Sequence, residues 1–172
     1  MEFEYELTEK DYINFNIFHF GNSKAVKRSL LVQRIIGPLF FIVFGYLYYQ
    51  IETVSLPLLI LVIIALSAVW IILYPMRFKG YITRNTKRMI EEGNNALILG
   101  KHHVTMNKNG FTDKTSRSQT SLQWKNAVSF QEDKDNLYLY HSPSYAYIIP
   151  KDKVGNVEEV KKFIQTNLPA SI

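Results

Sequence analysis

The sequence predicts a pair of membrane-spanning α-helices joined to an α+β domain of antiparallel strands that ends in a helix. Residues 35–74 are almost entirely apolar and contain a single formal charge, that of Glu52. After Leu99 the spacing of apolar residues changes from helical to alternating, and it becomes helical again near the C-terminus. We therefore expect four regions: an N-terminal cytoplasmic strand and helix (1–34), a transmembrane hairpin (35–75), a membrane-proximal linker helix (76–99) and a roll of strands with a C-terminal helix (100–172).

Composition removes several kinds of chemistry. The chain contains no cysteine, which excludes disulfides, thiolate catalysis and cysteine-ligated metals. The N-terminus is rich in glutamate and has no early apolar run, unlike a secretory signal peptide. We therefore expect the apolar segments to remain in the mature protein.

The hairpin consists of two apolar segments, Ile35–Tyr49 and Leu56–Tyr74, with a short connector. A helix needs roughly 20 apolar residues to cross about 30 Å of hydrocarbon. The second segment almost meets this length alone, and the first is expected to recruit its flanks. Pro57 fits the first turn of the second helix, and Pro75 is expected to end it. A buried helical pair in a soluble fold is the alternative, but such helices usually keep a polar face.

Basic residues flank the hairpin on both sides and are absent from its connector. Because lysine and arginine favour the cytoplasmic side, we expect a multi-pass protein of the cell membrane with both termini in the cytoplasm. Either the flanking cations contact anionic headgroups or they only fix the topology. We call them the basic collar: Lys24, Lys27, Arg28, Arg34, Arg77, Lys79 and Arg84.

The N-terminal segment predicts a strand followed by a helix. Apolar residues alternate with glutamates over residues 3–7, the period of a half-buried strand. Thr8–Asp11 indicates a capping box, and the helix it opens is expected to break at Gly21-Asn22-Ser23. Two spans return the chain to its starting side, so we expect residues 3–7 to pair with an edge of the C-terminal sheet. The aromatic face of the helix lies either on the membrane surface or against that domain, and we favour the domain: Tyr12, Phe15, Phe18 and His19.

The C-terminal half predicts a helix from Arg77 to Glu92, with Gly93-Asn94-Asn95 as its stop. Turn sequences then separate six short strands of an antiparallel meander. A final helix over about Val157–Leu168 places its apolar residues on one stripe. The expected strands are His102–Met106, Gly110–Thr115, Thr120–Trp124, Ala127–Glu132, Leu137–Tyr140 and Tyr145–Ile149.

Several stretches together resemble the YcxB-like family of bacterial membrane proteins. They are Thr8–Tyr12, Phe18–Ser23, Tyr74-Pro75, Gly110-Phe111, Ser121–Trp124 and Ala146–Lys151. The resemblance implies a membrane hairpin and a cytoplasmic domain similar to bacterial pleckstrin-homology domains. Six strands and one amphipathic helix suit such a pleckstrin-homology-like roll, which normally has seven strands. The resemblance brings no assigned activity, cofactor or catalytic motif.

The sequence contains no glycine-rich phosphate loop and no HExxH or GxSxG motif. His102 and His103 are adjacent on an expected strand and point to opposite faces, so both cannot bind one ion. One of them could meet His141 across the sheet, but we expect no metal and no cofactor. The apolar alternation predicts a filled roll with little interior for a substrate cavity. We therefore expect a protein that binds rather than an enzyme.

Turn lysines and an arginine form a candidate patch for an anionic ligand or lipid, with ordinary solvated side chains as the alternative: Lys108, Lys114, Arg117 and Lys125. No nucleic-acid partner is expected, because the basic residues gather near the membrane rather than along the sheet. The oligomeric state does not follow from the sequence. Two classes of function remain open. One is a membrane-anchored cytoplasmic binding module for a protein, peptide or anionic lipid, and the other is a protective or regulatory membrane subunit, such as an immunity-type protein acting on a toxin or transporter.

Overall fold

The computed structural model describes residues 1–51, 54–93 and 98–169. They form two compact units, one of Met1–His19 with Asn85–Ile172 and one of Phe20–Arg84. Glu52 of the hairpin connector, and Asn94 and Asn95 of the expected helix stop, lie outside the described residues.

Two long helices make up most of the second unit. Helix α2 covers Lys24–Ile51 and helix α3 covers Leu56–Glu91. Both are long and apolar enough to cross a membrane, and hardly any of their apolar residues are buried within the structure. Such exposed apolar surface is stable in lipid and not in water. The two helices therefore indicate a membrane protein, as the sequence predicts.

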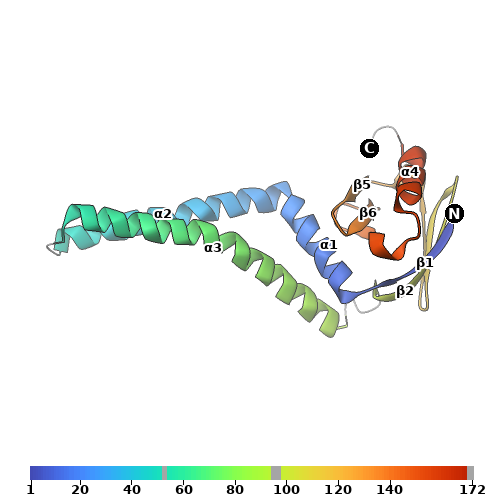
Figure 1. Ribbon diagram of the computed structural model, residues 1–172, viewed down its shortest axis with the longest axis horizontal. Helices are drawn as coiled ribbons and strands as arrows, with labels where there is room; N and C mark the ends of the chain where they lie inside the picture. Colours follow the sequence, from blue (N-terminus) through green and yellow to red (C-terminus); the bar gives the residue numbers. More distant parts are fainter. Residues whose placement is uncertain (52–53, 94–97, 170–172) are drawn as a thin grey trace. The chain divides into compact units, whose positions relative to one another are not determined.

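The two helices pack closely through glycine. Gly37 lies against the ring of Trp70, and Gly45 lies against Ile63, so α2 and α3 run antiparallel. Figure 1 shows them side by side near the C-terminal end of α2 and diverging towards its N-terminal end. Small residues thus set the close approach, as is usual between membrane helices.

Pro75 does not end the second helix, contrary to expectation. Helix α3 continues through Pro75 to Glu91, so the expected linker helix is its C-terminal part. Proline removes one backbone hydrogen bond, which a long helix tolerates when the flanking turns remain intact. Gly93 has a φ of 78°, the left-handed conformation that commonly follows a helix end.

The N-terminal residues join the C-terminal domain. Strand β1 (Glu2–Leu7) pairs antiparallel with β2 (Gly100–Asn107), with Leu7 opposite Gly100. Figure 1 shows the two strands adjacent although their colours mark distant parts of the chain. The predicted pairing is therefore confirmed, and the membrane hairpin is inserted between two neighbouring strands of one sheet.

Helix α1 (Glu9–Asn22) begins at the predicted capping box. The Asp11 carboxylate accepts from the Thr8 backbone N–H at 3.0 Å, and the Asp11 N–H donates to the Thr8 hydroxyl at 3.4 Å. The helix ends at Asn22, within the predicted break at Gly21-Asn22-Ser23, and α2 begins at Lys24. Its aromatic face packs on the domain: Phe15 and Phe18 lie 5.4 and 4.8 Å from the ring of Tyr138.

The domain contains two antiparallel sheets and a C-terminal helix. The first sheet has the order β1-β2-β3-β4 and the second β5-β6-β7. Helix α4 contributes Val160 and Ile164 to the shared core, and the Asn156 side chain caps its N-terminus. The remaining elements are β3 (Gly110–Thr115), β4 (Gln119–Gln123), a 3-10 turn (Trp124–Asn126), β5 (Ser129–Glu132), β6 (Asn136–Tyr140), β7 (Ala146–Pro150), a second 3-10 turn (Lys151–Lys153) and α4 (Val157–Asn167).

Candidate functional site

The expected anionic-ligand patch is divided between the two ends of β3. Gly110 pairs with Gln123 and Lys114 with Gln119, so Lys108 and Lys125 lie near one end and Lys114 and Arg117 near the other. The ends are roughly 14 Å apart at about 3.4 Å per residue. The four cations therefore form two pairs rather than one patch. Lys114 is also paired across the sheet with His103 on β2, which is itself paired with Glu4 on β1.

The basic collar has a different character. All seven of its side chains are exposed, and none forms an ion pair with any described residue. Other lysines of the chain are paired, for example Lys153 with Asp11 at 2.8 Å. Arg28 on α2 and Lys79 on α3 lie equally far along their helices from the Gly37–Trp70 contact. The collar is thus a set of unneutralised cations at the same end of both helices.

The adjacent histidines occupy opposite faces of β2, as predicted. His103 is half-exposed and forms ion pairs with Glu2 and Glu4, which raise its pKa above the ordinary value. His102 is only 5% exposed and points into the domain. No group of three or more metal-ligating side chains occurs among the residues that the structure describes.

A cavity of about 230 Å³ lies inside the domain beside His102. The roll is therefore not completely filled by its side chains. The buried wall of the cavity comes from the four-stranded sheet and β7: Tyr5, Leu7, His102, Asp113 and Ile148. Its more exposed lining includes Ser118, Thr120, His141 and Tyr145, with Ile98, Thr115, Ala146 and Tyr147 between.

The His102–Asp113 pair is the most polar feature of the cavity wall. Nδ1 of His102 lies 2.8 Å from a carboxylate oxygen of Asp113, and Nε2 lies 2.8 Å from the carbonyl oxygen of Ile98. Both partners are acceptors, so the geometry favours a doubly protonated ring. Burial lowers the pKa of His102, but the hydrogen bond and charge of Asp113 and the Ile98 carbonyl outweigh it, and the pKa is raised.

Aromatic rings surround this pair. The ring of Tyr5 lies parallel to that of His102, with centroids 5.1 Å apart. Tyr147 contacts Phe111 and His141 at 4.5 and 5.1 Å, and its hydroxyl bonds the Thr120 hydroxyl at 3.1 Å. Sequence reasoning treated these tyrosines as core. The one available signal was Asp113, a carboxylate at an inward-facing position of its strand.

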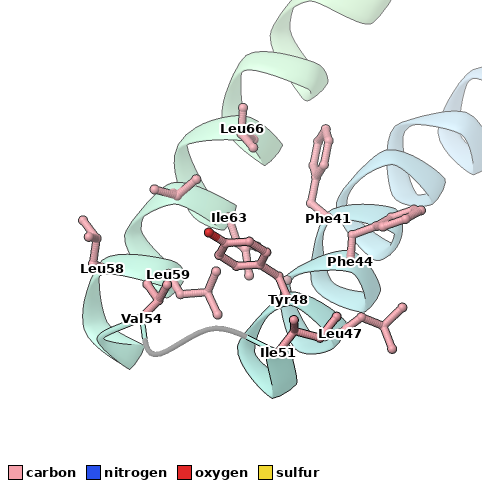
Figure 2. Close-up of a pocket in the computed structure, with 12 residues that line it drawn as sticks. Phe41, Phe44, Leu47, Tyr48, Ile51, Val54, Leu58, Leu59, Ile63 and Leu66 are labelled. Carbon is pink, nitrogen blue, oxygen red and sulfur yellow. The ribbon is translucent and has the colours of Figure 1, made fainter.

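The hairpin unit has a recess of its own. It has a volume of about 720 Å³ and lies between α2 and α3 near their connected ends. Figure 2 shows residues that line it, among them Phe41, Phe44 and Tyr48 from α2 and Leu59, Ile63 and Leu66 from α3. Among the described residues that line it, the Tyr48 hydroxyl is the single polar side-chain group, so this part of the recess suits hydrocarbon.

Comparison with known proteins gives one match. No curated protein and no solved structure is significantly similar to the chain. A family model described as YcxB-like protein matches residues 107–166, from the end of β2 into α4. The two apolar helices agree with the membrane hairpin that this resemblance implies. The predicted resemblance is therefore confirmed, and the strands from β3 to β7 with most of α4 form a YcxB-like region.

Proposed function

We propose that this protein is a membrane-anchored cytoplasmic binding module whose basic collar holds anionic lipid headgroups. The observation that carries the proposal is the concentration, at one end of the hairpin, of seven exposed cations that have no carboxylate partner among the residues that the structure describes. Each cation near an anionic surface contributes about 1 kcal/mol. An unpaired side chain has that interaction available, whereas the ion-paired lysines elsewhere do not.

The pairing of β1 with β2 supports the proposed topology. The hairpin lies between these strands in the chain, so both of its ends must lie in the same compartment for the strands to meet. Two spans satisfy this requirement. The positions of the collar cations favour the cytoplasm as that compartment.

The strand arrangement supports a pleckstrin-homology-like roll. A four-stranded and a three-stranded antiparallel sheet are followed by a C-terminal helix. The sequence offered six strands for this plan, and β1 supplies the seventh from before the hairpin. In this interpretation the membrane hairpin is an insertion between the first two strands of the roll.

The geometry of the histidines supports binding rather than catalysis. A general base needs a free ring nitrogen directed at the reacting group. Both nitrogens of His102 already have partners, Asp113 and Ile98. His103 is bonded to carboxylates on the outer face, and no hydroxyl nucleophile bonds His141 among the described residues.

The recess in the hairpin supports the second candidate, a protective or regulatory subunit that acts through its helices. In this candidate a helix of a partner protein sits in the recess between Phe44 and Leu59. The larger side chain of Leu59→Trp would fill that space, so the variant should no longer form a cross-link between the partner helix and α2. Lipid chains alone would fill the recess without producing a specific cross-link.

The proposal is tested with full-length protein by native mass spectrometry in the presence of phosphatidylglycerol or phosphatidylcholine. One variant removes three collar charges (Arg77→Gln, Lys79→Gln, Arg84→Gln). The matched control removes three exposed charges from the domain (Lys108→Gln, Lys125→Gln, Lys134→Gln). We expect the collar variant alone to lose bound phosphatidylglycerol, and added salt to weaken binding. Equal retention in both variants would contradict a lipid-binding collar and favour a protein or peptide partner.

A further inference from the structure

The side chains around the cavity of the domain present no unbalanced charge. His102 and Asp113 neutralise each other at 2.8 Å. The other lining side chains are aromatic, aliphatic or hydroxyl groups, apart from His141. Burial lowers the pKa of His141, so its ring is neutral at neutral pH. An ionised ligand would lose its hydration here without gaining a counter-charge, so the cavity suits an uncharged one.

Unused hydrogen-bonding groups face the same space. The Tyr5 side chain is 6% exposed, and its hydroxyl has no hydrogen-bond partner among the described residues. Burial, together with the charge of Asp113, raises the pKa of Tyr5 well above its ordinary value, so the hydroxyl keeps its proton. Thr120 accepts from Tyr147 and retains a proton to donate. A ligand with both donor and acceptor atoms would find partners.

The walls are flat and the space is small. Tyr5 stacks on His102 with an angle of 5° between the rings. Tyr147 on β7 and His141, which follows β6, add further aromatic rings from the three-stranded sheet. Such faces favour planar ligands. The volume of about 230 Å³ is below the roughly 300–1,000 Å³ of sites for drug-sized molecules. One or two rings fit that size.

We propose that this cavity binds an uncharged, planar nitrogen heteroaromatic molecule of one or two rings, with its heteroatoms towards Tyr5 and Thr120 and its ring against Tyr147. The site is separate from the collar and does not depend on lipid binding. The ligand would lie beside Ile98, the residue bonded to His102 where the chain enters β2.

The four histidines provide an internal test. His102 and His141 line the cavity, whereas His19 and His103 do not. Full-length protein with labelled histidine rings is titrated with uracil, adenine and orotate, and ring shifts are followed by NMR. These polar probes partition little into detergent. We expect saturable shifts of His102 and His141 with uracil or adenine, and at least about tenfold weaker binding of orotate, whose carboxylate must be desolvated.

Two conservative variants locate the site. Tyr5→Phe removes only the hydroxyl, and Thr120→Ala removes the other donor, so each should weaken binding about twofold to tenfold. Ser121→Ala is the matched control, because Ser121 is adjacent on β4 and bonds Thr112 on the opposite face. Equal shifts of all four histidines, a preference for orotate, no saturable response to uracil or adenine, or an equal effect of Ser121→Ala would each overturn the proposal.

Discussion

The indole nitrogen of Trp70 on α3 donates a hydrogen bond to the backbone carbonyl oxygen of Gln33 on α2, at 3.1 Å. The contact depends on Gly37, one turn further along α2, because a methyl group there would collide with the Trp70 ring. Tyr74 stacks on the same ring with centroids 5.7 Å apart. A glycine, an indole and a carbonyl thus hold the two helices together at this contact.

Replacing Gly37 by alanine should destabilise the hairpin. Inserting a methyl group into a tight contact costs about 1–3 kcal/mol. Gly80→Ala is the control, because nothing lies within 4 Å of the added methyl group and alanine favours a helix by up to about 1 kcal/mol. Thermal unfolding in detergent, followed by circular dichroism, should show a lower Tm for Gly37→Ala and an unchanged or higher Tm for Gly80→Ala. Equal Tm values would show that the helices separate easily.

The hairpin and the pairing of β1 were predictable because each follows from local periodicity and one topological argument. Two spans return the chain to its starting side, and an alternating segment needs a sheet. The break at Gly21-Asn22-Ser23 was also predictable from its turn residues, and α1 ends there at Asn22. The helix end expected at Pro75 was wrong. Proline lowers the local preference for a helix by about 3 kcal/mol, and the long flanking turns of α3 outweigh that preference.

Strand β1 should contribute substantially to the stability of the domain. Leu7 is 2% exposed in the shared core, and truncating such a residue costs about 2–5 kcal/mol. Glu6→Ala is the matched control, because Glu6 is adjacent, exposed and on the opposite face. Urea unfolding of the full chain should show a marked loss for Leu7→Ala and little change for Glu6→Ala. An equally small loss of unfolding free energy in both variants would mean that β1 contributes through its backbone alone.

The cavity could not be read from the alternation of strand residues. That pattern placed His102 and His103 on opposite faces of their strand, as the structure has them. It does not give the separation of two sheets, which depends on the sizes of side chains from β1, β3 and β7 together. Likewise, Asp113 is visibly polar at an inward position, but its partner follows from the register that sets His102 diagonally across from it.

The His102–Asp113 pair should make stability depend on pH. Because the pKa of His102 is raised by folding, its contribution is complete below the unfolded value of about 6.5 and is lost as pH rises through the folded value. His103 acts in the same direction, whereas the lowered pKa values of His19 and His141 act oppositely. The difference in unfolding free energy between the wild type and His102→Gln isolates the pair. It should shrink with rising pH, and an increase would contradict the assigned protonation.

Labelling of single cysteines should establish the topology, and the native chain helps because it has no thiol of its own. Lys10 lies before the hairpin, Lys108 follows it, and Ser55 starts its second half, all three exposed. In intact cells an impermeant thiol reagent should label Ser55→Cys and should not reach Lys10→Cys or Lys108→Cys.

Permeabilised cells provide the control, because all three variants should then react. Two other labelling patterns in intact cells would contradict different parts of the assignment. Labelling of Lys10→Cys and Lys108→Cys without Ser55→Cys would reverse the orientation and contradict the use of the collar as a cytoplasmic signal. Opposite labelling of Lys10→Cys and Lys108→Cys would contradict the pairing of β1 with β2 itself, because strands in different compartments cannot share a sheet.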